Sequence, residues 1–404
     1  MIDDKILDVT DDVKWIGVLD EGLVTFDVVM ETQYGTTYNS YFIDADKKTI
    51  IETAKEGFKD TFLDKVKRVV DYEDIEYIVL NHTEPDHSGS LKHLIKLAPQ
   101  ATVVGSKSAI NFLNHMIDFE FKQMVVKDGD TLDLGNKTLK FIAAPFLHWP
   151  DTMYTYLEED KLLFTCDSFG SHYCDKRMFD DLVDDFDDAF EYYFDVILRP
   201  FSGFMLKAID KIKDLDIDTV CTGHGPILRS NWKKYVDWTK DMAEHTEEVC
   251  KELRVFIPYV SAYGNTRKIA EKIGEGIKQA SSEIDVTIMD IEHTTAPEIE
   301  EEVYRSCAFI VGSPTMNQNT LLPIYTLMAV INPVRNRGKL AGAFGSYGWS
   351  GEAVKIIQDN LKNLKFKIYD EDGLKVNFVP YGASDERAIE YGLGFGRKLL
   401  ENRK

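Results

Sequence analysis

The last third of the chain alternates between short apolar runs and amphipathic segments, and few folds accept that order. The amphipathic segments follow loops of small and polar residues and carry apolar residues at helical spacing. Strands joined by helices pair in parallel, so five strands alternating with five helices predict a doubly wound parallel sheet. The predicted strands are 254–260, 285–290, 308–315, 340–348 and 374–380.

The earlier part of the chain has a different pattern. Short segments rich in β-branched and aromatic residues are separated by turn signals, which is typical of strands, and helical stretches lie between some of them. The strand candidates are Val13–Leu19, Leu23–Met30, Tyr38–Ile43, Met153–Leu157 and Lys161–Cys166, and the helical ones are Thr61–Val70 and Ser108–Met116. We expect sheets with helices packed outside them. Together with the pattern change near residue 250, this predicts two domains, 1–250 and 254–404.

Composition excludes several classes of protein. A net charge of −22 argues against nucleic acid or an anionic membrane as the main partner. No apolar run approaches the ~20 residues of a membrane span, and the acidic N-terminus lacks the layout of a secretion signal. The five cysteines are well separated and form no C-x-x-C pair. We therefore expect reduced thiols in the cytoplasm and no Cys-ligated metal cluster.

Metal-capable side chains follow four of the apolar runs. The first group, in NHTEPDHSGS, contains His82, Glu84, Asp86 and His87, and the later ones contribute His148, Asp167 and His224. Ligands at the ends of neighbouring strands converge, and nearby Gly and Pro residues let the loops bend toward one centre. Any one of these residues alone could be a hydrogen-bonded structural residue. The four groups in this order predict a metal site.

The order and spacing resemble the metallo-β-lactamase fold, in which H-x-H-x-D-H and three later residues hold two metals. Glu84 stands where the hydrolases carry His. A carboxylate in place of an imidazole makes the site harder and more anionic, which favours iron over zinc. The pattern H-x-E-x-D-H is similar to the diiron domain of the flavodiiron proteins, also called A-type flavoproteins. That resemblance implies one iron on His82, Glu84 and His148, a second on Asp86, His87 and His224, and Asp167 as the bridge.

Aromatic residues and a further histidine are candidates for a role beside the metals. Tyr193, like its neighbour Tyr192, could donate a hydrogen bond or an electron to bound O₂, and His172 could support the site. A core aromatic is the alternative interpretation of each tyrosine.

Three loops of the second part predict a flavin site. The loop SAYGNT lies between a strand and a helix, where backbone N–H groups and the helix dipole favour a phosphate. It resembles the flavodoxin loop that binds the phosphate of FMN, and two later loops leave the same edge of the sheet and match the loops that contact the ribityl chain and the ring. The predicted contacts are Ser261, Ala262, Tyr263, Gly264, Asn265 and Thr266, then Ser313, Pro314, Thr315, Met316 and Asn317, then Ser346, Tyr347, Gly348, Trp349 and Gly351.

The family resemblance covers nearly the whole chain and implies the minimal two-domain form, without an attached rubredoxin or flavin-reductase module. It implies an oxidoreductase that passes electrons through FMN to a diiron centre, in a head-to-tail homodimer that could pair into a tetramer. We favour reduced coenzyme F420 as the donor, from the resemblance to the methanogen oxidases, and O₂ as the oxidant. NO reduction with a rubredoxin donor is the alternative. A binuclear hydrolase and an electron carrier without turnover are the other classes that remain open.

Overall fold

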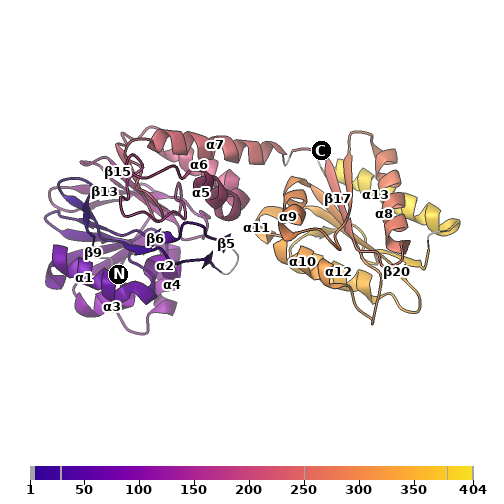
Figure 1. Ribbon diagram of the computed structural model, residues 1–404, viewed down its shortest axis with the longest axis horizontal. Helices are drawn as coiled ribbons and strands as arrows, with labels where there is room; N and C mark the ends of the chain where they lie inside the picture. Colours follow the sequence, from indigo (N-terminus) through magenta and orange to yellow (C-terminus); the bar gives the residue numbers. More distant parts are fainter. Residues whose placement is uncertain (1–4, 28–29, 250, 380, 403–404) are drawn as a thin grey trace. The chain divides into compact units, whose positions relative to one another are not determined.

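The computed structural model describes residues 5–27, 30–249, 251–379 and 381–402. The chain divides into two compact units, residues 1–244 and 245–404. Figure 1 labels the elements of both. The expected domain boundary at residue 250 and the end of the expected strand at residue 380 fall outside the described residues. None of the described helices combines the length and the apolar surface that crossing a membrane requires.

The first unit contains two sheets that pack face to face. The larger sheet is antiparallel at one side and parallel from β8 onward, in the order β1 (Leu7–Asp8), β2 (Val13–Trp15), β7 (Tyr41–Ile43), β8 (Lys48–Ile51), β9 (Ile75–Leu80), β10 (Thr102–Ser106) and β11 (Lys122–Val126). The smaller sheet is antiparallel except for its last pair, in the order β12 (Thr131–Asp133), β13 (Thr138–Ala143), β14 (Met153–Leu157), β15 (Leu162–Cys166) and β16 (Thr219–Thr222).

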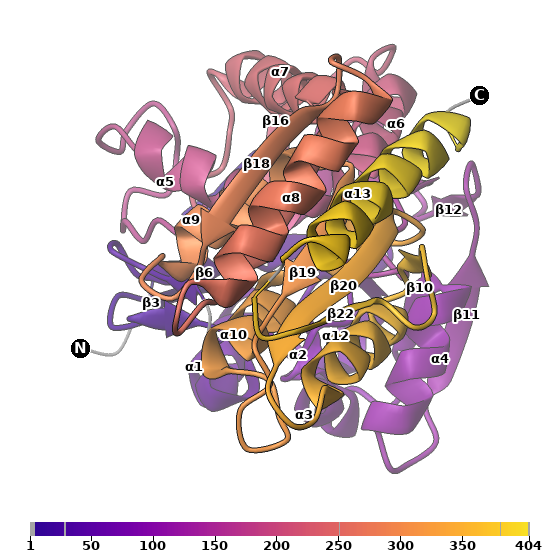
Figure 2. The ribbon, with the colours of Figure 1, turned by 90° about the vertical axis from the view of Figure 1, so that its right-hand side faces the viewer.

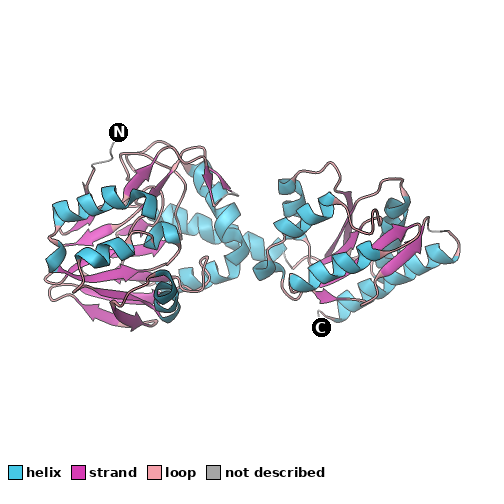
Figure 3. Ribbon diagram, turned by 90° about the horizontal axis from the view of Figure 1, so that it is seen from below, coloured by secondary structure: helices cyan, strands magenta, loops and turns pink. Residues whose placement is uncertain are grey.

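Apolar side chains from both sheets form the layer between them. Val79 of the larger sheet and Phe164 of the smaller one belong to this buried cluster. A second cluster lies between the sheets and the helices outside them, which are visible in Figure 3. These helices are α1 (Lys59–Val69), α2 (Pro85–Ser88), α3 (Leu91–Leu97), α4 (Lys107–Met116), α5 (Asp187–Tyr193), α6 (Ser202–Ile212) and α7 (Trp232–Val249), with a π-helical segment at Phe194–Leu198 and 3₁₀ turns at Glu56–Phe58, Tyr72–Asp74 and Arg199–Phe201. The metallo-β-lactamase-like αββα sandwich is confirmed.

Three of the expected strands are wrong, because each is divided into two. Val13–Leu19 is divided between β2 and β3 (Val18–Asp20), and Tyr38–Ile43 between β6 (Thr36–Tyr38) and β7, with the two parts in different sheets. The segment Leu23–Met30 forms two short strands, β4 (Thr25–Phe26) and β5 (Met30–Glu31), which pair antiparallel. Asp27 has a φ of 46°, which ends the extended conformation directly after Phe26. Another two-stranded sheet pairs β3 (Val18–Asp20) with β6 (Thr36–Tyr38).

The second unit is a parallel sheet with helices on both faces. Its order is β18 (Asp285–Asp290), β17 (Arg254–Tyr259), β19 (Ala308–Gly312) and β20 (Leu340–Tyr347), and a fifth position is shared by β21 (Lys367–Ile368) and β22 (Leu374–Asn377), which pair with successive parts of β20. One face is covered by α8 (Asn265–Ala280) and α13 (Ala383–Glu401), side by side in Figure 2, and the other by α9 (Ala296–Arg305), α10 (Leu322–Val330) and α12 (Glu352–Asn363). The short helix α11 is Pro333–Asn336. The doubly wound sheet is confirmed.

The close packing of α8 against α13 depends on glycine. A Cβ atom on Gly276 would overlap the carbonyl oxygen of Ile389, and one on Gly392 would overlap that of Ile273. The two backbones therefore approach each other more closely than side chains would permit.

Candidate functional site

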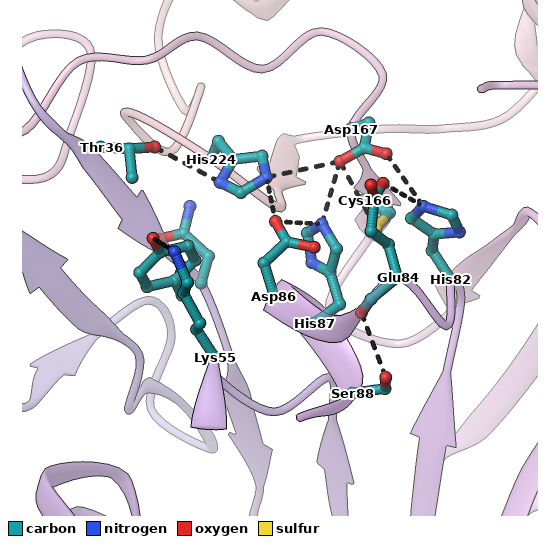
Figure 4. Close-up of polar contacts among 12 residues, drawn as sticks. Thr36, Lys55, His82, Glu84, Asp86, His87, Ser88, Cys166, Asp167 and His224 are labelled. Carbon is teal, nitrogen blue, oxygen red and sulfur yellow. Dashed lines mark hydrogen bonds and ion pairs between the residues drawn. The ribbon is translucent and has the colours of Figure 1, made fainter. Parts of the chain in front are cut away.

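The seven predicted metal-capable side chains lie together at the strand ends of the first unit. Figure 4 labels all of them except His148. His82 and Glu84 follow β9, and Asp86 and His87 are on α2, whose first residue is Pro85. The remaining three come from the segments after β13, β15 and β16 and are His148, Asp167 and His224. Both sheets therefore contribute, and the site exists only when they are packed together.

The first group of ligand atoms comes from His82, Glu84, His148 and Asp167, all within 4.8 Å of one another. Glu84 Oε2 lies 3.1 Å from His82 Nε2 and 2.9 Å from His148 Nε2. Asp167 Oδ2 lies 3.5 Å from His82 Nε2 and 3.6 Å from His148 Nε2. Two imidazoles and two carboxylates thus face one point.

The second group comes from Asp86, His87 and His224. Asp86 Oδ2 lies 3.3 Å from His87 Nε2 and 3.1 Å from His224 Nε2. Asp167 reaches this group with its other oxygen, because Oδ1 lies 3.0 Å from His87 Nε2 and 3.5 Å from His224 Nε2. Asp167 therefore presents one oxygen to each group, which is the geometry of a bridging carboxylate.

The charges of these buried groups hold one another in place. Burial would raise the pKa of Asp167, but the imidazoles of His87, His82 and His148 outweigh it and hold that pKa well below its usual value. Burial would likewise lower the pKa of His87, but Asp86 and Asp167 raise it to about 9. Both oxygens of Asp86 and Oδ2 of Asp167 are buried and accept no hydrogen bond from any residue that the structure describes. Cations bound between these groups would satisfy those oxygens, so the donor set fits a metal pair.

Groups behind two of the imidazoles fix their orientation. Asp151 Oδ2 lies 3.4 Å from His82 Nδ1 and accepts hydrogen bonds from the N–H and Oγ1 of Thr83, at 2.8 and 2.7 Å. His224 Nδ1 lies 2.6 Å from the carbonyl oxygen of Thr37, to which it can donate. In both cases Nε2 is left facing the ligand cluster, as a metal requires. Asp151 is not predicted from the sequence, in which its place three residues after His148 is the only signal.

The aromatic and histidine candidates differ in their surroundings. Tyr193 is buried at the end of α5, and its hydroxyl has no hydrogen-bond partner among the described residues. Its ring centroid is 4.9 Å from that of His172 and 6.2 Å from that of His224. Nδ1 of His172 lies 2.8 Å from Oγ1 of Thr36, and burial together with His224 lowers the pKa of His172 well below its usual value. Tyr192 is partly exposed and lines a cavity of about 220 Å³ beside His172.

The three loops of the second unit meet at the carboxyl edge of neighbouring strands. Thr266 Oγ1 lies 2.9 Å from Ser346 Oγ, which joins the first and third loops. The N–H of Thr315 donates to the carbonyl oxygen of Ser346, also at 2.9 Å, which joins the second and third loops. Gly264 caps α8 with a φ of 78°, which places it in the left-handed region that glycine adopts without strain.

The other predicted flavin contacts lie on these same loops. Ser261 Oγ accepts from the N–H of Arg267 at 3.2 Å, and the carbonyl oxygen of Gly348 accepts from Asn377 Nδ2 at 3.0 Å. Tyr263 and Trp349 are each 84 % exposed. The remaining residues on these three segments are Ala262 and Asn265, Ser313, Pro314, Met316 and Asn317, and Tyr347 and Gly351.

Comparison with known proteins accounts for both units. A family model described as ODP family beta lactamase matches residues 36–225, and a flavodoxin model matches residues 257–392. The chain is 39% identical over 402 residues to the flavo-diiron protein FprA2 of Clostridium acetobutylicum, covering 97% of this chain and 99% of that protein. It is 33% identical to a nitric oxide reductase of Moorella thermoacetica, covering 97% and 98% of the two chains. The structure of rubredoxin oxygen:oxidoreductase from Desulfovibrio gigas matches with a TM-score of 0.70 and 28% identity, covering 99% of this chain and 100% of that one.

Proposed function

The chain belongs to the flavodiiron proteins, and from this premise we propose that it carries electrons from a reduced donor through FMN to a diiron centre that reduces O₂ to water. The single observation that carries the proposal is Asp167, which directs one oxygen to each of two groups of ligands. Glu84 in the first group supports iron rather than zinc.

We propose the following ligands. One iron is held by His82, Glu84 and His148, the other by Asp86, His87 and His224, and Asp167 bridges them. Bound iron supplies electrons and open coordination positions for a small oxidant. The chain's own contribution is to bring seven side chains together, six of them buried, so that imidazoles and carboxylates face one another before a metal binds.

Tyr193 and His172 have separate roles in the proposal. The Tyr193 hydroxyl is buried and has no hydrogen-bond partner among the described residues. Burial and the nearby carboxylates of Asp167 and Asp86 raise its pKa well above the usual value, so it lies near the ligand cluster. It can donate a hydrogen bond to an oxidant there. His172 packs against the Tyr193 ring and lines the cavity beside α5, where it limits the movement of that ring.

For FMN, we propose that residues 261–266 bind the phosphate. The helix start at Asn265 and the hydroxyls of Ser261 and Thr266 support that role. Residues 313–317 and 346–351 contact the ribityl chain and the ring, and the exposed side chains of Tyr263 and Trp349 are available to cover the ring.

The donor and the oxidant are separate parts of the proposal. We favour F420H₂ on the sequence resemblance alone, and the name of the Desulfovibrio gigas relative supports rubredoxin as the alternative donor. We favour O₂, whose reduction to two waters consumes four electrons and four protons. The name of the Moorella thermoacetica relative supports the second candidate, in which two NO, two electrons and two protons give N₂O and water. We further propose a cytoplasmic, head-to-tail homodimer, or a tetramer built from two such dimers, with 1–250 and 254–404 as the two domains.

The first test is anaerobic metal and flavin analysis of the purified protein, followed by turnover. Two irons and one FMN per chain are expected, and O₂ and NO consumption should then be compared with F420H₂ and with reduced rubredoxin as donors. Zinc without FMN would point to a hydrolase, and FMN without metal would point to an electron carrier. Either result would overturn the proposal.

A further inference from the structure

We propose that Glu52 is a positioning residue that holds the His87 imidazole from behind, so that Nε2 faces the second iron. This inference rests on the proposed function, because it assigns a role toward one of the two irons. Nothing in the sequence marks Glu52, which follows β8 and lies 30 residues or more from every proposed ligand in the chain.

The backbone fixes Glu52 in an uncommon conformation. Its φ is 61°, in the left-handed region that residues other than glycine rarely adopt because the conformation is strained. Its N–H donates to the carbonyl oxygen of Val79 at 2.9 Å, and its carbonyl oxygen accepts from Ser40 Oγ at 2.8 Å. Strain that the surrounding structure maintains is found at functional sites, and here it turns a carboxylate into the buried interior.

The next residue ties this segment to His87. The N–H of Thr53 and its Oγ1 both donate to the carbonyl oxygen of His87, at 2.9 and 2.6 Å. The segment of Glu52 and Thr53 therefore holds the backbone of His87 at a fixed distance. The Glu52 side chain is fixed as well, because Oε1 accepts from the N–H of Asn81 at 2.7 Å.

The ring of His87 needs an acceptor on the side away from the metal. Nε2 contacts Asp167 and Asp86, and Nδ1 is buried with no hydrogen-bond partner among the described residues. A carboxylate oxygen of Glu52, a ring nitrogen of His87 and Sγ of Cys166 all lie within 4.8 Å of one another. Glu52 Oε2 is likewise buried without a partner. A carboxylate oxygen is a strong hydrogen-bond acceptor, whereas a cysteine sulfur is a weak one, so Glu52 is the acceptor of this set.

His82 and His224 show the arrangement that we propose for His87. Asp151 stands behind Nδ1 of His82, and the carbonyl oxygen of Thr37 stands behind Nδ1 of His224. Metal-binding histidines almost always donate their other N–H to such a group, which fixes the tautomer. The unpartnered Oε2 of Glu52 belongs to the carboxylate that is placed to be the acceptor His87 lacks.

The test is the variant Glu52→Gln. It keeps the size of the side chain but replaces one acceptor oxygen of the carboxylate by an amide N–H₂ group, which is a donor. In this variant the amide oxygen still accepts from the N–H of Asn81, so the amide N–H₂ is turned toward His87. Nδ1 of His87 must then accept a hydrogen bond from it. The ring proton moves to Nε2 and competes with iron there. We expect roughly 10–100-fold weaker binding of one iron, the loss of one of two Mössbauer components, and unchanged FMN content.

The matched control is Asp180→Asn. Asp180 is also a buried carboxylate that accepts from backbone N–H groups, those of Arg229, Ser230 and Asn231, and none of these belongs to the ligand cluster. This variant should lose stability and keep both irons at wild-type affinity. Wild-type iron binding in Glu52→Gln would overturn the inference.

A second measurement does not depend on whether Glu52→Gln folds. In the zinc-substituted wild-type protein, ¹⁵N-histidine NMR should show a slowly exchanging Nδ1–H on His87, assigned by its absence in His87→Gln. An Nδ1–H of His87 that exchanges as fast as that of an exposed histidine would also overturn the inference. Wild-type protein that binds no iron would instead overturn the proposed function, so the two failures are distinguishable.

Discussion

The two candidate cofactor sites are built in opposite ways. The proposed metal ligands are side chains gathered among packed strand ends, and the most exposed of them, His148, has a side chain only 20% exposed. The flavin loops rely on backbone groups and small residues, and they leave the aromatic rings of Tyr263 and Trp349 almost fully in solvent. Folding alone therefore completes the first site, whereas the second has apolar surface that only a ligand or a partner would cover. The two should respond differently to mutation.

The largest effect should come from Asp167→Ala. This change removes the carboxylate that serves both ligand groups and leaves four imidazoles close together. We expect iron content near zero and turnover at least about 100-fold lower, since even residues behind a ligand account for roughly 10–100-fold. FMN content should not change. Iron analysis by mass spectrometry and the flavin absorbance measure both, and normal iron content would rule out the bridging role.

Gly264→Val tests the other site. A β-branched residue at a φ of 78° costs about 1–2 kcal/mol, which corresponds to roughly 5–30-fold weaker FMN binding if the loop must keep this conformation. Iron content should stay at the wild-type value. Flavin fluorescence titration measures the affinity.

Gly338→Val is the matched control, because Gly338 has a φ of 80° and a Cβ there also meets no neighbouring atom within 4 Å. It precedes β20 at the amino edge of the sheet, away from the predicted flavin loops. It should lower stability without weakening FMN binding. Equal FMN affinity in both variants would remove the phosphate-loop assignment.

Asp151→Asn should have a smaller effect, confined to one half of the metal site. The amide oxygen can still accept from Thr83, but it is a weaker acceptor for His82 Nδ1 than a carboxylate is. We expect roughly 10-fold weaker binding of one iron. The Mössbauer component that weakens should differ from the one affected in Glu52→Gln, and the same component in both variants would contradict the assignment of His82 and His87 to different irons.

The smallest expected effect is the pH dependence of the iron-free protein. The pKa of His87 is raised from 6.5 to about 9, so its charged form stabilises the folded state. This contribution, about 1–3 kcal/mol, is present in full below about pH 6.5, declines above it and is gone above about pH 9. Iron replaces the ring proton, so the iron-loaded protein should not show this decline. Thermal unfolding from pH 6 to 9.5 compares the two forms, and parallel curves would contradict the prediction.

The parts of the molecule that could be predicted are those in which residues of one kind recur at a regular spacing along the sequence. The alternation after residue 254 is reproduced as parallel strands and helices, and the side chains of His82, His148, Asp167 and His224 converge as expected from their positions after apolar runs. Glu52, Thr36 and Asp151 could not be predicted, because a single residue behind a ligand has no spacing of its own and depends on how loops fold onto it. The break at Asp27 was missed for a related reason, since a left-handed backbone conformation leaves no hydrophobic pattern.

The spread of the ligands along the chain has a consequence for biosynthesis. The first of them is residue 82 and the last is residue 224, which follows the final strand of the smaller sheet. At roughly 5–20 residues per second, the ribosome takes several seconds or more to make the stretch between them. Iron therefore cannot be inserted fully into a growing chain until both sheets are complete. Iron must be delivered to a domain whose two sheets are complete, and the flavin loops are synthesised after that domain.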